Sequence, residues 1–146
     1  MSEQKATGVP PLQTWLEAFL AERGGVAGSV HCLRGQLLEL AAHVRLPAPV
    51  VEKTRQIPKG KGMAGLAWER ERVVSTCNLK TDTSGDVRPG AKAVDAGAAL
   101  AIPVRDAAGG VRAVVGIAFR GERELSEAEQ AELERAAQAL PNDADP

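Results

Sequence analysis

One long segment, CNLKTDTSGDVRPGAK, gathers side chains that could bind a small polar ligand. Its candidate ligand-binding residues are Asn78, Thr81, Asp82, Arg88 and Lys92. Arg88 and Lys92 could hold an anion, because a guanidinium offers a planar fork of donors that matches phosphate or carboxylate. The same composition also suits a solvated loop built from Asp and Ser/Thr turns, and both interpretations stay open. Structureless connections of this length are uncommon in compact domains and are often functional, which supports a binding role.

Three glycines, Gly60, Gly62 and Gly65, fit the spacing G-x-G-x-x-G in the stretch IPKGKGMAGLAW. A dinucleotide-binding loop with this spacing needs a buried strand before it and an acidic residue at a strand end about 20 residues later. The preceding stretch VVEKTRQIPK is charged and contains Pro58, and no strand–helix–strand unit follows. No G-K-[ST] motif occurs, which excludes a P-loop. The glycines therefore indicate a tight turn with positive φ at Gly60 and Gly62, and a close helix contact at Gly65.

The chain has two cysteines and two histidines. Cys77, which opens the polar segment, could be a reactive thiol at the mouth of a pocket, but a small buried apolar residue is the favoured interpretation. Cys32 lies within an expected strand, where a packing role has even more support. His31 and His43 lack the further ligands that a metal site needs, so we expect them on the solvent side or at an interface.

Composition excludes several classes of function. The 146 residues carry a net charge of −1 without a basic stripe, which argues against nucleic acid and membrane partners. Only 3% of residues are aromatic, too few for a base-stacking surface. No apolar run approaches the roughly 20 residues of a membrane span, and the N-terminus has no signal-peptide pattern. We expect one cytoplasmic domain with no cofactor and no metal.

Periodicity and turn signals predict the elements that must position these residues. Helical patterns occupy Leu12–Leu20, Val50–Arg55, Leu66–Arg70 and a final segment that begins at Ser126 with a capping box to Glu129. Predicted strands are Ser29–Leu33, Leu37–Val44, Arg72–Thr76, Ala98–Val104 and Val111–Phe119. Pro103 should lie at a sheet edge, a bulge or near a strand end, because it cannot donate to a ladder.

Short hairpins dominate this order, so the fold class is α+β with a mostly antiparallel sheet and the terminal helices together on one face. Residues 1–10 form an expected flexible tail, residues 11–140 the domain, and residues 141–146 an acidic tail.

Three stretches, in the right order, resemble GAF domains. IPKGKGMAGLAWERERVVST resembles the central GAF signature, GAALAIPVRDAAGGVRAVVGIAF its paired strands, and ELSEAEQAELERAAQAL its closing helix. The resemblance covers about Leu12 to Leu140 and implies a profilin-like antiparallel sheet, with terminal helices on one face and a ligand pocket on the other. The related roadblock fold also resembles the first helix and hairpin, but the glycine stretch, the long loop and Pro103 fit GAF domains better.

Within that resemblance, the glycines shape the rim of the pocket. Met63 and Trp68 line its base or simply pack in the core, and the strand AALAI contributes Leu100 and Ile102. The expected site therefore comprises Met63, Trp68, Cys77, Asn78, Thr81, Asp82, Arg88, Lys92, Leu100 and Ile102.

The chain also resembles free methionine-(R)-sulfoxide reductase, a single-domain GAF enzyme. That family places a cysteine in the glycine signature and others in the following segment, whereas this chain has GMAG and AKAVDAGAA there, without thiols. Thiol chemistry on a sulfoxide needs a nucleophile and a resolving partner. We therefore expect no enzyme activity and no catalytic residue.

Three functions follow from the resemblance, in decreasing order of support. The first is a sensory domain that binds a small molecule and acts in signalling through a separate partner protein. The second is a ligand-free homodimer that serves as an interaction adaptor, and the third is the reductase.

Overall fold

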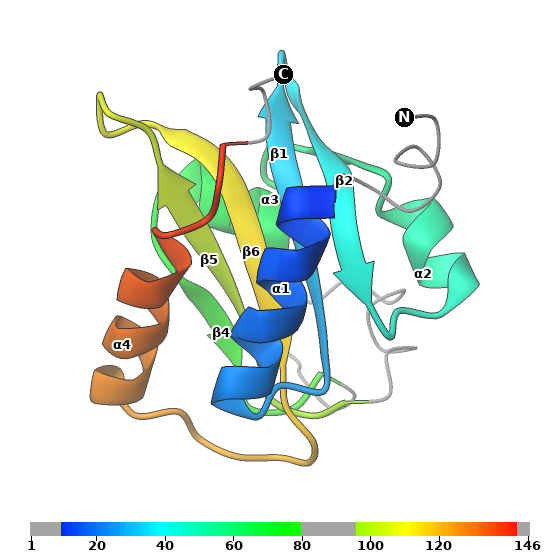
Figure 1. The fold of residues 1–146 in the computed structure, drawn as a ribbon, viewed down its shortest axis with the longest axis vertical. Coiled ribbons are helices and arrows are strands. Elements are labelled where there is room, and N and C mark those ends of the chain that lie inside the picture. The colour runs from blue at the N-terminus through cyan, green and yellow to red at the C-terminus, as the bar shows by residue number, and fades with distance from the viewer. Residues whose placement is uncertain (1–9, 80–95, 143–146) are drawn as a thin grey trace.

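The structure, a computed structural model of the chain, describes residues 10–79 and 96–142. Ten elements follow one another in these two stretches (Figure 1). In chain order they are α1 (Pro10–Arg23), β1 (Ala27–Arg34), β2 (Leu37–Val44), α2 (Ala48–Lys53), β3 (Gln56–Pro58), α3 (Gly62–Arg70), β4 (Val74–Thr76), β5 (Ala99–Arg105), β6 (Val111–Ala118) and α4 (Glu127–Ala137).

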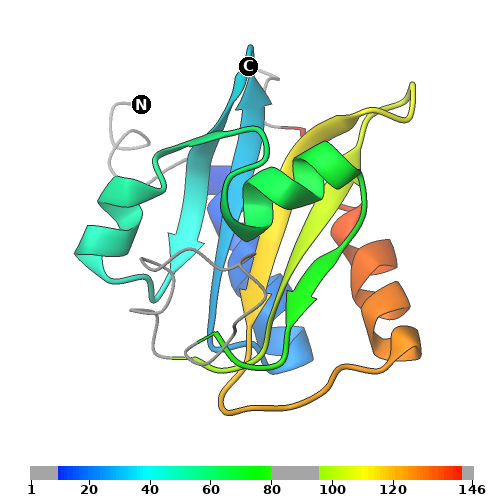
Figure 2. The same cartoon turned by 180° about the vertical axis from the view of Figure 1, so that it is seen from behind.

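The six strands form one sheet in the order β3-β2-β1-β6-β5-β4, and every neighbouring pair is antiparallel. Helices α1 and α4 cover one face (Figure 1), and α3 lies across the other face with α2 to its side (Figure 2). This arrangement confirms the α+β prediction and the pairing of the terminal helices on one face. The antiparallel pairing also rules out the dinucleotide-binding topology, which requires parallel strands.

Two local features differ from the sequence prediction. β3 was not expected, because Gln56–Pro58 lies in a charged stretch, yet it pairs with the edge of β2 through Leu38 and Ile57. α3 begins at Gly62 rather than Leu66, so the glycine stretch itself forms the first turn of the helix. A short edge strand and a glycine-rich helix start are both set by tertiary contacts rather than by propensity.

Pro103 lies within β5, although proline has no backbone N–H to donate to a neighbouring strand. β4 pairs with β5 only from Ala99 to Ala101, so Pro103 lies beyond the end of that short neighbour. The prediction of an edge position is confirmed, because on that side β5 has no strand partner at Pro103.

A large core cluster lies between the sheet and the terminal helices. Leu12, Leu16 and Leu20 on α1 are buried at helical spacing, and Leu133 and Ala137 do the same on α4. Trp15 packs against this core and stacks on Phe19 with ring centroids 4.8 Å apart. Trp15 thus packs on its own domain. None of the helices in the described stretches is long and apolar enough to span a membrane.

The start of α4 confirms the predicted capping box. Ser126 accepts a hydrogen bond from the Glu129 backbone N–H at 3.1 Å, and the Glu129 carboxylate accepts one from the Ser126 N–H at 3.0 Å. We expect Ser126→Ala to lower the free energy of unfolding by about 1 kcal/mol, because a helical N–H loses its acceptor. Urea denaturation would measure the loss. Ser75→Ala, at an exposed serine of β4, is the control and should change little; equal effects would contradict the capping role.

Candidate functional site

A cavity of about 530 Å³ lies on the face of the sheet away from α1 and α4. Its floor is formed by β1, β6 and β5, and its walls come from α2, the start of α3 and Leu79. This volume falls within the range of pockets that hold small molecules. The cavity occupies the position that the GAF resemblance assigned to a ligand pocket.

Small residues on the floor create the hollow. Two rows run across the three strands: Ala27, Ala118 and Ala99 in one, and Ser29, Gly116 and Ala101 in the other. A Cβ at Gly116 would lie 2.9 Å from the Ser29 hydroxyl oxygen, so glycine keeps room for that hydroxyl. Because strand side chains alternate, the large residues next to these rows face the terminal helices instead. They are Val30, Leu100, Ile102, Val115 and Ile117, all in the core cluster under α1 and α4.

The glycine stretch forms one wall, as predicted. Gly60 and Gly62 have φ of 83° and 67°, a region that favours glycine. A Cβ at Gly65 would lie 2.6 Å from the Pro58 carbonyl oxygen, which explains the close contact expected there. Lys61 precedes α3 and provides no side-chain cap, so the first-turn N–H groups of the helix gain no partner from it.

His31 is the most deeply buried polar group in the cavity wall, with 3% of its surface exposed. Its Nε2 lies 2.7 Å from the Thr54 carbonyl oxygen at the end of α2. Because a carbonyl only accepts, Nε2 carries the proton and donates, which leaves Nδ1 as a bare acceptor. Burial lowers the pKa of His31 to about 4, so the ring is neutral at pH 7. The expectation that His31 lies on the solvent side is wrong, because helices cover both faces of this sheet.

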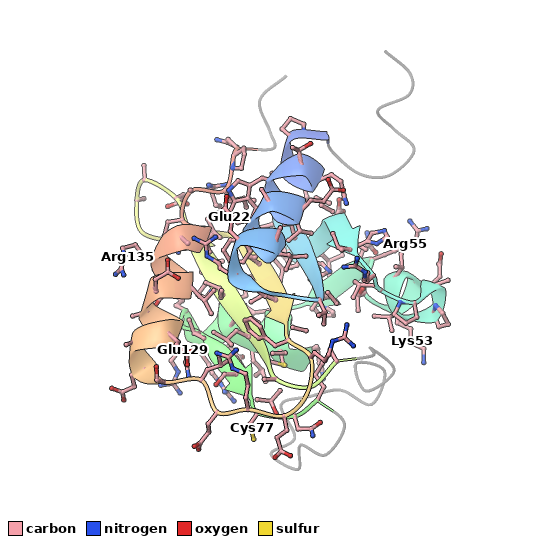
Figure 3. All side chains as sticks on the ribbon, turned by 60° about the horizontal axis from the view of Figure 1, so that its bottom comes forward. Glu22, Lys53, Arg55, Cys77, Glu129 and Arg135 are labelled. Carbon is pink, nitrogen blue, oxygen red and sulfur yellow. The ribbon has the colours of Figure 1, made fainter. Side chains whose placement is uncertain are left out.

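The charged residues that line the described part of the cavity are all basic. Among the described lining residues, Lys53 and Lys61 are charged and no carboxylate is present. Both lysines are exposed, so their charges belong to the mouth of the cavity rather than its floor. Figure 3 labels Lys53 and Arg55 on the side of the molecule where α2 lies. The described part of the site therefore favours a ligand with an anionic group.

Of the predicted site residues that the structure describes, Met63 and Leu100 line the cavity. Leu100 borders it, although its side chain belongs to the core under α1 and α4. Ile102 does not line the cavity, because it faces that same core. Trp68 does not line it either: five positions separate it from Met63, which places the two about 140° apart around α3. Trp68 packs in a neighbouring cluster, with the Lys59 ammonium 5.5 Å from its ring centroid.

The described site residues predicted from the polar segment do not line the cavity. Cys77 is exposed and Asn78 is half-buried, and neither lines the cavity. The favoured burial of Cys77 is wrong, because Val74 and Thr76 take the inner positions of β4 and the alternation turns Cys77 outward (Figure 3). The remaining four residues, Thr81, Asp82, Arg88 and Lys92, lie outside the described residues, and their role stays a prediction.

Neither cysteine of the chain lines the cavity. Cys32 is buried in the core on the opposite face of the sheet, and Cys77 is at the surface. No group of three or more His, Cys, Asp or Glu side chains within residues 10–79 and 96–142 could hold a metal ion.

Sequence reasoning missed several lining residues, above all His31, Lys53, Thr54 and Lys61. One signal was present. The small residues Ala27, Ser29, Ala99, Ala101, Gly116 and Ala118 recur with period two in three strands, and such a pattern indicates a face that leaves space. Only the pairing register shows that these positions are neighbours.

Comparisons with known proteins agree with this architecture. A sequence model of the GAF domain matches residues 12–140. No curated protein matches the sequence. Among solved structures, a GAF domain from a phosphoenolpyruvate-protein phosphotransferase of Coxiella burnetii is similar, with a TM-score of 0.73 and 21% identity over 95% of this chain and 84% of that one. The type II free methionine-R-sulfoxide reductase of Thermoplasma acidophilum has a TM-score of 0.70 and 18% identity over 90% of this chain and 87% of that one.

Proposed function

The chain belongs to the GAF domain family, and we propose that it binds a small molecule in the cavity and reports it to a separate signalling protein. The observation that carries the proposal is the 530 Å³ cavity over two rows of small residues. A domain used only as an adaptor would gain stability by filling this space, because large side chains pack better than a void. The two lysines at the mouth give the cavity polar groups that a ligand could use.

Binding without catalysis is the second part of the proposal. The fold is shared with free methionine-R-sulfoxide reductases, but identities below 25% carry no activity across. Cys32 and Cys77 lie outside the cavity, so no thiol is placed to attack a sulfoxide bound there. A coupled assay that follows NADPH oxidation with free methionine sulfoxide and a thiol-reducing system would detect turnover. Turnover that Cys77→Ser abolishes would contradict the proposal.

Filling the cavity tests the binding site directly. Ala118 lies on the floor between Ala27 and Ala99, and the larger side chain of Ala118→Leu would occupy part of the space. We expect the variant to lose about tenfold or more in affinity for 8-anilinonaphthalene-1-sulfonate, or roughly 1.4 kcal/mol. A fluorescence titration of the full chain measures this affinity.

Ala131→Leu is the matched control, because Ala131 is exposed on α4 and lies far from the floor. It should leave the affinity unchanged. If the wild-type protein binds no dye, the proposed site is contradicted. The same holds if the wild type and Ala118→Leu bind the dye with equal affinity. A native mass spectrum of freshly purified protein complements the titration: an added mass that disappears on denaturation would identify a co-purified ligand.

A further inference from the structure

The Ser29 hydroxyl is the polar side-chain group within the two rows of small residues on the cavity floor. A Cβ at Gly116, the residue opposite on β6, would lie 2.9 Å from the Ser29 oxygen. Opposite Cβ atoms on antiparallel strands are usually about 4.5–5.5 Å apart, so the shorter distance shows that the hydroxyl leans from β1 toward β6. Because β6 is the middle strand of the floor, the hydroxyl lies near the centre of the floor.

This hydroxyl is open to the cavity. Ser29 is half-buried and lines the cavity, and its side chain has no hydrogen bond with another described residue. In the described part of the chain, Nε of Arg23 and Nδ1 of His31 are the side-chain atoms that packing encloses without a partner, and the Ser29 oxygen is not one of them. A hydroxyl both donates and accepts, so a bound molecule could meet it with either a carbonyl or a hydroxyl group.

The surroundings of this hydroxyl are apolar. The other floor positions are alanines and a glycine, and Val50 and Leu79 stand in the walls. The charged groups among the described lining residues, Lys53 and Lys61, are exposed at the mouth. A charged group on the floor would therefore lose its hydration without an opposite charge beside it, which is far more costly than burying a neutral polar group. A neutral group also regains a hydrogen bond from Ser29.

The floor also sets the size of the buried body. Neighbouring strands lie about 4.8 Å apart, and alternate residues of one strand about 7 Å apart, so the two rows cover about 10 Å by 7 Å. No side chain larger than serine interrupts this area. One ring or two fused rings fit on such a surface.

We propose that the cavity takes a compact ring compound whose buried end is uncharged and carries a hydroxyl or carbonyl group hydrogen-bonded to Oγ of Ser29. The proposal rests on the proposed function and names the class of ligand for that cavity. An anionic group on the same molecule would stay at the mouth, beside Lys53 and Lys61. A molecule whose only polar group is charged gains nothing from Ser29.

Phenol and toluene test the hydrogen bond, because they have nearly the same shape and differ in a hydroxyl. NMR titration of the full chain gives an affinity for each fragment, and the backbone N–H resonances of Ser29, Gly116 and Ala118 report binding at the floor. We expect the ratio of phenol to toluene affinity to fall about fivefold in Ser29→Ala, the effect of one typical hydrogen bond. An unchanged ratio would overturn the proposal.

The variant is suited to this test because the Ser29 hydroxyl has no partner among the described residues, so its removal leaves none of their polar groups unsatisfied. Ser75→Ala is the matched control, since Ser75 is exposed on β4 and does not line the cavity. It should leave the ratio of phenol to toluene affinity unchanged. An equal fall in the two variants would contradict a role of Ser29.

Benzamide and benzoate test the charge, because they also share a shape and only benzoate is ionised. We expect Ser29→Ala to lower the affinity for benzamide about fivefold, since its carbonyl loses the hydroxyl donor. The affinity for benzoate should stay the same, because its carboxylate remains hydrated at the mouth. An equal loss for both fragments would show that a charged group reaches the floor and would overturn the uncharged end.

The two levels of inference fail differently. If the fragments shift the floor resonances but Ser29→Ala weakens all four equally, the proposed function stands and the ligand class is wrong. If none of the four fragments shifts any resonance of a floor residue, the proposed function fails together with the ligand class.

Discussion

Replacing Gly97 with alanine is expected to lower the free energy of unfolding by about 3 kcal/mol. A Cβ at this position would lie 2.0 Å from the Gly121 carbonyl oxygen and 2.2 Å from its carbonyl carbon. These are backbone atoms and cannot rotate away. They are also fixed, because Ala98 N–H donates to the Gly121 carbonyl at 3.0 Å and Gly97 N–H donates to the Phe119 carbonyl at 2.7 Å. Urea denaturation followed by circular dichroism measures the loss.

The Gly97 junction also matters for the cavity. The Gly97 carbonyl accepts a hydrogen bond from the Leu79 N–H at 2.9 Å, and Leu79 is a cavity wall residue. A displaced Gly97 should therefore weaken dye binding as well as stability. Gly110→Ala is the matched control, because the nearest atom to a Cβ there is a flexible Asp106 carboxylate oxygen at 3.4 Å. If both alanine variants were equally stable, the close approach at Gly97 would be relaxed in solution.

Acidification from above pH 6.5 to below pH 4 is expected to lower the free energy of unfolding by about 3 kcal/mol through His31 alone. Burial lowers the pKa of His31 from 6.5 to about 4 in the folded state. The unfolded chain therefore takes up a proton near pH 6.5 that the folded protein refuses until about pH 4. The contribution of His31 to stability is complete above pH 6.5 and is lost as pH falls toward 4. Urea denaturation at pH 7 and pH 5 should differ by about 2 kcal/mol from this group.

Variants assign that pH dependence to one residue. His31→Leu should remove most of the change between pH 7 and pH 5, although it lowers stability at pH 7 by leaving the Thr54 carbonyl without its donor. His43→Gln removes the other histidine of the chain, retains His31 and should keep the change. An unaltered pH dependence in His31→Leu would show that the imidazole is not buried as described.

A physical asymmetry between the two faces of the sheet connects these predictions. On one face, the large residues of β1, β5 and β6 pack under α1 and α4 and supply most of the core. On the other, small residues in the same strands leave a cavity next to a buried imidazole. Because successive residues of a strand face opposite ways, alternate positions of the same strands form the packed core on one face and the cavity on the other. The scaffold can therefore stay stable while its second face keeps space.

Local chemistry made part of the structure predictable from the sequence. The hairpin strand Leu37–Val44 and the Ser126 capping box depend on neighbouring residues and were correctly expected. The same holds for the positive φ of Gly60 and Gly62. The order of short hairpins predicted the antiparallel sheet. The GAF resemblance added the position of the pocket, which Met63 lines.

What the sequence by itself determined is thus every described element except β3, the fold class and the presence of a glycine-shaped wall. Only the tertiary structure decided which side chains meet in the cavity. β5 is apolar at every position from Ala99 to Val104, so its pattern does not say which residues face the helices, and Ile102 was assigned to the wrong side. His31 looks like a surface residue in its strand, and becomes a buried acceptor because α2, distant in sequence, brings the Thr54 carbonyl to it.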